Sequence, residues 1–442
     1  MNLSPVPLDA ISSDELSASV AGMAAESVTR LTLFHQYIWI FVIAFGVTIV
    51  ATPIMRRVAI FFGTVDHPTD LRKVHRMPIA YLGGVAVFLG ILGGIVYSYF
   101  AIRYQGLMAF HDINDVNLNK YRDPYGVPLS IVFGITIITA IGLWDDVAGI
   151  PPMTKIGGQL MAAAALAYTN VGVEVAKGVL APIGNLMGNP EMLFVIPIPG
   201  LSGIEIDGIY WAGTAVIAVF VIGGCNASNL VDGLDGLLTG ITAIAAAGLL
   251  FIALTLALLD DGPRDAQRIV LCMALLGACL GFLPHNFNPA TIFLGDCGSM
   301  LLGFCTIVII LTLGDTGKTH LVFAGLFIYA IPIIDTVLAI VRRKMSGSSI
   351  SDADDQHLHH MLKRALGVKG AVLTLYAIGA GFAVLGVAMS LGRARMAYAV
   401  ALVFAAFIGV TAIKIARLAN IESEAHRAVE QRKGAPNGRP GK

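Results

Sequence analysis

Charged residues are scarce in this sequence. They make up 13% of its 442 residues, while 56% are hydrophobic. A soluble domain averages about 25% charged residues. Lysine plus arginine and aspartate plus glutamate both number 29, so no excess of positive charge indicates a nucleic-acid partner. The composition excludes a soluble globular domain and indicates a polytopic membrane protein of the all-α class.

Two further features are absent. The five cysteines include no C-x-x-C pair and lie in or beside apolar segments, so we interpret them as small reduced apolar residues. Residues 1–33 contain only one basic residue, Arg30, and lack the basic start and early apolar core of a secretory signal. We therefore expect no disulfide framework, and we interpret residues 1–33 as an N-terminal extracytoplasmic segment.

Long apolar runs dominate the rest of the chain. A membrane-spanning helix needs about 17–25 residues, and this length predicts a bundle of ten or eleven transmembrane helices over residues 34–416. A basic, disordered cytoplasmic tail is predicted over residues 417–442. The apolar runs lie near 34–54, 79–101, 127–144, 156–173, 209–225, 237–259, 268–284, 298–313, 320–341, 370–391 and 396–416.

Basic residues predict the orientation of these helices. With the N-terminus outside, the inner loops and the C-terminal tail hold 18 Lys and Arg, and the outer segments hold 10. In this orientation every polar cluster falls on the inner side, which predicts a chemical site at the cytoplasmic face. The clusters are residues 66–76, 145–155, 226–235, 286–299 and 352–360.

Residues 226–237 form an unusually polar link between two apolar runs, with the sequence NASNLVDGLDGL. Asn226, Asn229, Asp232 and Asp235 follow one another at a spacing of three, so each is a neighbour of the next on a helix-like path. An ionised carboxylate costs about 2.5–3.5 kcal/mol at the centre of a membrane helix and less near its ends. We therefore interpret this link as part of a site for a metal ion and the phosphates of a nucleotide sugar.

Other carboxylates of the same face can complete a metal site. Asp145 and Asp146 are adjacent, so in a low-dielectric setting they require a cation or a shared proton. Asp296 has glycines on both sides, including Gly295, which allow close approach to a ligand. Magnesium takes one or two carboxylates and completes its shell with water and substrate phosphate. Each of these acids also has a purely structural interpretation, as a solvated residue at a helix end or as part of a Gly-Asp turn.

Basic and amide side chains of the inner loops are candidates for phosphate binding. The orientation rule alone also explains basic residues in the first inner loop. Lys155 can contact a phosphate or mark the membrane boundary, and Asn286 can cap a turn or donate to the nucleotide. The candidates in the first inner loop are Asp66, Arg72, Lys73 and His75.

The last inner loop carries three histidines. Apolar residues from Leu358 to Leu366 recur at helical spacing, which predicts a short amphipathic helix on the membrane. The histidines can contact phosphate or sugar, or belong to a solvated face. Zinc has little support, because no cysteine or H-x3-H pair accompanies them. Asp335 lies about two helical turns before Arg342, and we predict that the two side chains form an ion pair with a structural role. The histidines are His357, His359 and His360.

Several short motifs follow one another between about residues 35 and 415. They are Asp66 with Pro68, Arg72-Lys73 with His75, Gly83-Gly84, Asp145-Asp146, Asn226, Asn229, Asp232-Gly233, Asp235-Gly236, Asn286, Phe293, Gly295-Asp296, Gly298-Ser299, Pro332 with Asp335, and His357 with His359-His360. Their order and spacing resemble the polyprenyl-phosphate N-acetylhexosamine-1-phosphate transferase family. The H-x-H-H form resembles the branch that makes undecaprenyl-pyrophosphoryl GlcNAc, whereas the peptidoglycan branch typically carries a triple histidine. Ala80 stands where the family pattern P-x-P-x-x-G-G has its second proline. This difference concerns the geometry of the loop.

The resemblance implies a Mg2+-dependent enzyme, with Mn2+ as the alternative ion, in a bacterial inner membrane. Its substrates would be UDP-GlcNAc and undecaprenyl phosphate, and its product would enter a cell-surface polysaccharide such as the O-antigen of lipopolysaccharide. A homodimer is a family-level expectation. The implied metal ligands are Asp296 and Asp232, and the implied catalytic residues are Asp145, Asp146, Asp232 and Asp235. The implied substrate-binding residues are Asp66, Arg72, Lys73, His75, Lys155, Asn226, Asn229, Asn286, Gly295, His357, His359 and His360.

A secondary transporter or lipid-linked sugar flippase is the competing function class. Such proteins place ionisable residues near the bilayer midplane, often within inverted repeats. Here the acids lie at helix ends and in loops of one side, and no repeat is evident. A purely structural scaffold would leave the inner carboxylates unexplained. The sequence leaves open the identity of the N-acetylhexosamine, and it does not distinguish direct attack from a covalent aspartyl intermediate.

Overall fold

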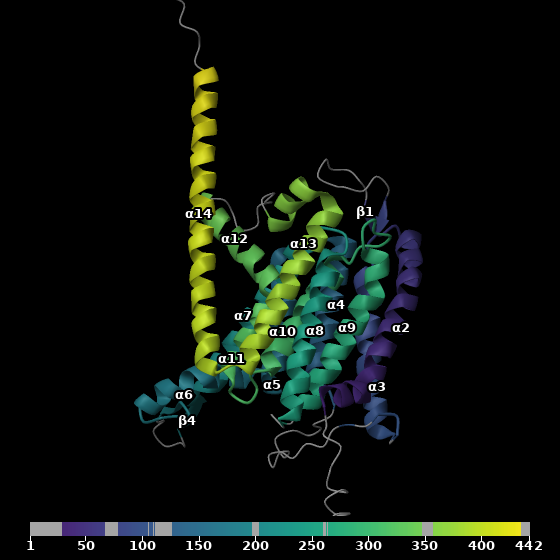
Figure 1. The fold of residues 1–442 in the computed structure, drawn as a ribbon, viewed down its shortest axis with the longest axis vertical. Helices are drawn as coiled ribbons and strands as arrows, with labels where there is room; N and C mark the ends of the chain where they lie inside the picture. Colours follow the sequence, from purple (N-terminus) through teal and green to yellow (C-terminus); the bar gives the residue numbers. More distant parts are fainter. Residues whose placement is uncertain are drawn as a thin grey trace, which may run out of the picture.

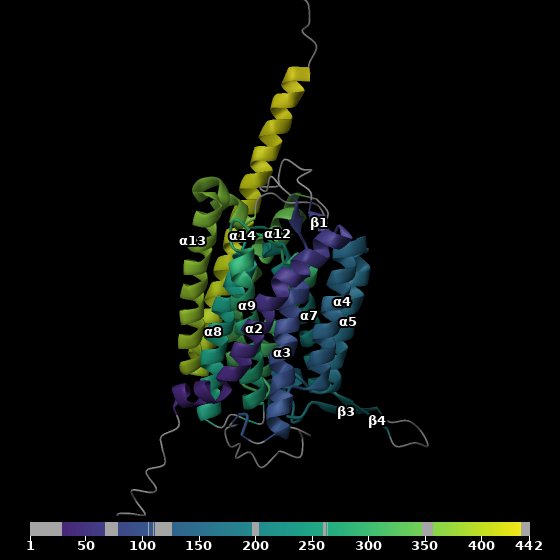
Figure 2. The ribbon, with the colours of Figure 1, turned by 90° about the vertical axis from the view of Figure 1, so that its right-hand side faces the viewer.

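The computed structural model describes residues 29–66, 78–104, 106–108, 110, 126–196, 203–259, 262, 264–346 and 357–434. Within these ranges nine helices are long and apolar enough to span a membrane, and the number is ten if one bent pair of helices counts as a single span. The molecule is an all-α bundle (Figures 1 and 2), as the sequence predicted. Arg72, Lys73 and His75 lie outside the described residues.

The helices of the bundle run in both directions between its two ends (Figure 1). Their bounds are α2 Arg30–Phe62, α3 Gly83–Arg103, α4 Leu129–Ala148, α5 Pro152–Tyr168, α6 Lys177–Leu186, α7 Gly208–Val231, α8 Leu237–Leu258, α9 Asp265–Asn286, α10 Gly295–Thr312, α11 Thr319–Ile328, α12 Ala330–Ser346, α13 Leu358–Leu391 and α14 Ala394–Gly434. A short 3-10 helix, η3, covers Val173–Ala176. At 17 residues, α5 is shorter than the nine spans, but it corresponds to the alanine-rich run near 156–173.

Helix α10 forms the centre of the bundle. Every residue of α10 is buried except Asp296, which is half-buried at its first turn. The helix packs against α3, α4, α7 and α8, because it is apolar on all sides and must be covered on all sides. Asp296 therefore lies at the one end of this central helix that is partly open.

The ninth predicted span is not a straight helix. It is divided into α11 and α12, which meet at an angle of 82°. Tyr329 ends α11, and Pro332 lies in the first turn of α12. Proline has no N–H to donate and favours the first turn of a helix, so a new helix starts there easily. The apolar run predicted over residues 320–341 is therefore present as a bent pair of helices, and Asp335 lies in its second half.

The C-terminal tail also differs from the prediction. Helix α14 continues without interruption to Gly434, and it extends well beyond the bundle (Figures 1 and 2). Residues 417–434, for which the sequence predicted disorder, are helical in the structure. This stretch is rich in Ala, Glu and Arg, which favour helix. Residues 435–442 lie outside the described part of the chain.

Two small hairpins lie at opposite ends of the bundle (Figures 1 and 2). Strands β3 (Leu193–Ile196) and β4 (Ile204–Asp207) pair antiparallel. At the other end, β1 (Val65–Asp66) pairs with β2 (Ile79–Ala80). Ala80 also bridges Ile292, so the β1–β2 hairpin touches the segment that leads into α10.

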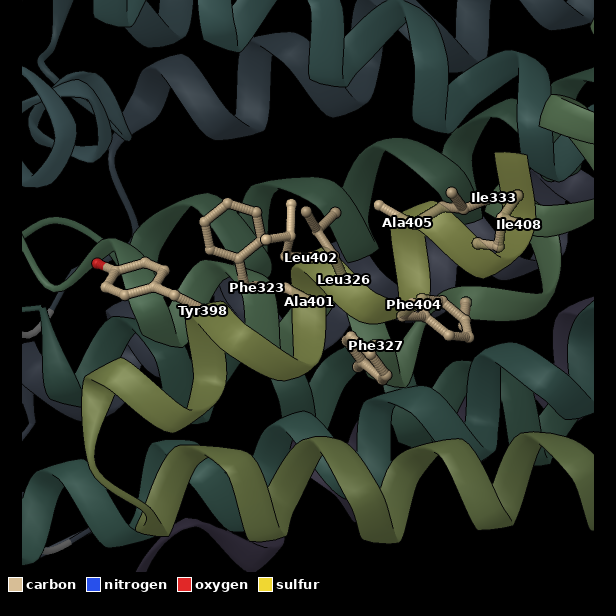
Figure 3. Close-up of a pocket in the computed structure, with 11 residues that line it drawn as sticks. Phe323, Leu326, Phe327, Ile333, Tyr398, Ala401, Leu402, Phe404, Ala405 and Ile408 are labelled. Atoms are coloured by element: carbon tan, nitrogen blue, oxygen red, sulfur yellow. The ribbon is translucent and has the colours of Figure 1, made fainter. Parts of the chain in front are cut away.

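An apolar pocket of about 370 Å3 lies between the bent pair α11–α12 and α14. Figure 3 shows side chains of α11 and α14 facing one another across it. Tyr398 is its one lining residue with a polar side-chain group. The other lining residues are Phe323, Leu326, Phe327, Ala330, Ile333, Ala401, Leu402, Phe404, Ala405 and Ile408.

Candidate functional site

Lys155 connects the acidic groups of two helices. Its Nζ lies 2.6 Å from Asp145 Oδ2, at the end of α4, and 2.5 Å from Asp296 Oδ2, at the start of α10. Asn229 of α7 donates to the same Asp296 oxygen at 3.0 Å. These side chains are partly open, with 20% of Lys155, 18% of Asp145 and 24% of Asp296 exposed. Residues far apart in the sequence thus form one polar site at the end of the membrane bundle.

Asp146 holds the start of α10 in place. Its two carboxylate oxygens accept from the backbone N–H groups of Asp296 at 2.8 Å and Cys297 at 3.0 Å. An anion is stabilised at this position, because the first N–H groups of a helix have no partner within it. Gly295 has φ +73°, and a Cβ added to it would lie 2.5 Å from an Asp146 oxygen. These contacts favour a positioning role for Asp146 and Gly295.

Tyr81 lies close to several carboxylates of the site. It precedes α3 and packs edge-on against Phe293, with ring centroids 5.9 Å apart. Burial and nearby negative charge raise the pKa of the Tyr81 phenol, so it stays a hydrogen-bond donor at neutral pH. The four carboxylates that act on it are Asp66, Asp146, Asp232 and Asp296.

Asp232 follows the last residue of α7 and is half-buried. Burial, and then the negative charge of Asp296, Asp146 and Asp235, raises the pKa of the Asp232 carboxyl well above its usual range. The site therefore contains more carboxyl groups than the single ammonium group of Lys155 can pair with. Such a site favours the binding of a further cation.

Two of the predicted polar residues support neighbouring backbone or side chains. Asp235 Oδ2 accepts from Asn288 Nδ2 at 2.8 Å and from the N–H of Ala290 at 3.0 Å. Asn286 is buried, accepts from Thr239 at 2.9 Å and donates to the Ile292 carbonyl at 3.2 Å. These contacts favour the turn-cap interpretation of Asn286 and a similar structural role for Asp235.

Asn226 contacts a glutamine that was not among the predicted site residues. Its amide donates to Gln159 Oε1 at 3.0 Å, and Gln159 is buried. Gln159 lies four residues after Lys155, so helical spacing from that lysine could have revealed it. Tyr81 was also missed, although it lies directly before Leu82 and the Gly83-Gly84 pair.

The three histidines occupy different environments. His357 and His359 are buried, whereas His360 is half-buried. The short helix predicted from Leu358 is present, and Gly367, with φ +72°, separates it from the rest of α13. The Asp335 carboxylate contacts His357 and His359, rather than acting as the predicted partner of Arg342.

Asp296 and Asp232 are the expected metal ligands. Among the described residues, no group of three or more His, Cys, Asp or Glu side chains is arranged around a common metal position. Magnesium needs only one or two carboxylates. Asp296 and Asp232 can supply these, and the gathering of Asp296, Asp146 and Asp235 near Asp232 suits a divalent cation. The residues present therefore fit Mg2+, with water and substrate phosphate as its other ligands.

Comparison with known proteins gives relatives that match most of the chain. Residues 128–314 match the model of glycosyl transferase family 4. A decaprenyl-phosphate N-acetylglucosaminephosphotransferase of Mycolicibacterium smegmatis is 34% identical over 84% of this chain and 86% of its own length. A probable undecaprenyl-phosphate N-acetylglucosaminyl 1-phosphate transferase of Bacillus subtilis is 28% identical, over 78% of this chain and 82% of its own.

A third relative is the undecaprenyl-phosphate alpha-N-acetylglucosaminyl 1-phosphate transferase of Escherichia coli. It is 30% identical over 70% of this chain and 72% of its own length. The matched region contains the helices that carry Asp145, Lys155, Asn229 and Asp296. This multi-pass membrane protein therefore belongs to glycosyl transferase family 4 and is an enzyme of the polyprenyl-phosphate N-acetylhexosamine-1-phosphate transferase kind.

Proposed function

We propose that this enzyme transfers GlcNAc-1-phosphate from UDP-GlcNAc to undecaprenyl phosphate and releases UMP. The observation that carries the proposal is the group formed by Lys155, Asp145, Asp296 and Asn229 at one end of a membrane bundle. A lipid substrate and a water-soluble nucleotide can meet only at such an end. The H-x-H-H form of residues 357–360 supports GlcNAc, and the distribution of basic residues supports a cytoplasmic site, an outside N-terminus and a cytoplasmic C-terminus.

The proposed reaction is a direct phosphoryl transfer. An oxygen of the polyprenyl phosphate attacks the β-phosphorus of UDP-GlcNAc, and the bond from that phosphorus to the bridging oxygen breaks. The electron pair leaves on the oxygen of UMP. The nucleophile is already an anion, so no residue has to remove a proton. The main barrier is the approach of two anions, and Lys155 supplies positive charge at that point.

We propose Mg2+ as the cofactor, with Asp296 and Asp232 as the residues that would hold it. When bound, the ion supplies positive charge that offsets the charge of the pyrophosphate. The protein residues position the site around it: Asp146 holds the first turn of α10, and Asn229 orients the Asp296 carboxylate. The apolar pocket between α11–α12 and α14 is suited to part of a hydrocarbon chain, which agrees with a polyprenyl substrate.

UMP release tests the proposal directly. Detergent-purified protein would be supplied with undecaprenyl phosphate, Mg2+ and UDP-GlcNAc, with UDP-GalNAc and UDP-MurNAc-pentapeptide in parallel. We expect UMP from UDP-GlcNAc alone, and none after addition of a chelator. UMP from another donor only would contradict the assignment of GlcNAc. Movement of a lipid-linked sugar without UMP release would favour a flippase, whose transporter folds share broken helices such as α11–α12.

Replacement of Lys155 should slow the reaction strongly. In Lys155→Gln the carboxylates of Asp145 and Asp296 lose the cation between them, and the approaching phosphates lose a positive charge. We expect kcat/KM to fall by roughly 100-fold or more. Lys177→Gln is the matched control, because Lys177 is 54% exposed and pairs with Glu174 at 3.4 Å at the opposite end. Equal rates for the two variants would rule out the role proposed for Lys155.

A further inference from the structure

The carboxylate of Asp335 is fully engaged by the segment that carries the histidines. Its Oδ1 accepts from the backbone N–H of Leu358 at 2.9 Å. Its Oδ2 lies 3.1 Å from His357 Nδ1 and 3.5 Å from His359 Nδ1. All three side chains are buried, with at most 5% exposed. A buried carboxylate needs such partners, so the segment and α12 hold each other in place.

The other side of the His359 ring faces the segment between α7 and α8 that contains Asp232 and Gly233. A Cβ added to Gly233 would overlap His359 Nε2, so the imidazole lies directly on the backbone next to Asp232. Glycine is required here because any side chain would displace the ring. The contacts thus run from Asp335 through His359 to the residue beside Asp232, one of the two proposed metal ligands.

An apolar layer supports this arrangement. Leu358 and Leu362 pack against a buried cluster that includes Val231 and Leu234, on both sides of Asp232, and Ile331 of α12. The bend between α11 and α12 sets the direction of α12, which carries Asp335 to the start of α13. The broken span is therefore part of the support for the site.

We propose that Asp335 is a positioning residue of the donor site. It holds residues 357–360 against Asp232–Gly233, so that His357 and His359 serve as buried supports and His360 is the histidine that meets the nucleotide sugar. The part of this inference that concerns the donor rests on the proposed function. The structural part concerns only the contacts of Asp335 and does not depend on which substrate is bound.

Two variants of Asp335 test the structural part by hydrogen exchange of the full-length protein. In Asp335→Ala the Leu358 N–H loses its acceptor, so amide exchange over residues 358–366 should accelerate by roughly tenfold or more. Asp335→Asn keeps an oxygen for that N–H and should lie between Asp335→Ala and wild type. Exchange at the start of α10 should not change. Unchanged exchange over 358–366 in Asp335→Ala would overturn the proposal, whether or not UDP-GlcNAc is the donor.

Steady-state kinetics test the functional part. We expect Asp335→Ala to raise KM for the nucleotide sugar by about tenfold, with partial rescue in Asp335→Asn, and KM for the polyprenyl phosphate to stay within about twofold. His360→Gln should raise the donor KM without faster exchange. Asp207→Ala is the matched control, because Asp207 also accepts a backbone N–H, from Tyr210 at 2.9 Å, but at the opposite end.

The outcomes separate positioning from general stability. If the activity of Asp335→Ala falls only in proportion to the fraction of folded protein, with an unchanged KM for the donor, Asp335 is merely structural. That result would overturn the inference. Absence of UMP release by the wild-type protein with UDP-GlcNAc would instead refute the proposed function. In that case the exchange experiment still decides whether Asp335 holds the histidine segment.

Discussion

Asp296→Asn should reduce UMP release by about 1000-fold, because it removes a charge at the centre of the site without changing the shape of the side chain. One Asp296 oxygen accepts from both Lys155 and Asn229, and an amide could not accept from both as strongly as a carboxylate does. Asp296 is also the one residue of α10 that is not buried. We therefore expect it to contribute more to the reaction than the acids that hold backbone N–H groups.

The measurement is the rate of Mg2+-dependent formation of lipid-linked product by purified Asp296→Asn protein. Thermal unfolding should show that the variant is folded, since Asp146 still holds the first turn of α10. Asp207→Asn, at the other end of the bundle, serves as the control for loss of one carboxylate. Retained Mg2+-dependent product formation by Asp296→Asn would contradict its assignment as a metal ligand.

Arg268→Met should destabilise the protein by about 3–5 kcal/mol, the cost of breaking a buried ion pair by removing one partner. Arg268 is fully buried near the start of α9, where it pairs with Asp265 and donates to the Thr312 carbonyl at 3.0 Å. Next to it Arg264 lies 2.5 Å from Asp315, which also accepts from Gly172 at 2.8 Å. This group joins α9 to the end of α10.

Thermal unfolding in detergent measures this effect. Arg393→Met is the matched control, because Arg393 is exposed at the same end of the bundle. We expect a large fall in Tm for Arg268→Met, little change for the control, and unchanged KM values for both substrates, because the proposed site lies at the opposite end. A Tm equal to that of wild type would show that the ion pair contributes little to stability.

Some roles within the site could not be read from the sequence. The motifs identified Asp145, Lys155, Asn229 and Asp296, and the structure brings these four residues together. The sequence could not show that Asp146 holds the start of α10, because that role depends on the distance between two helices 150 residues apart. The ion-pair network around Arg268 could not be predicted for the same reason. In the hydropathy pattern Arg268 only stands at the edge of an apolar run.

The sequence by itself determined the membrane class and the family. These follow from hydropathy and motif order, which are properties of short stretches of chain. Only the tertiary structure decided the bend between α11 and α12, the burial of His357 and His359, and the partners of Asp335. Each of these depends on which atoms meet across helices, and a hydrogen bond requires a distance of about 3 Å that no local pattern specifies.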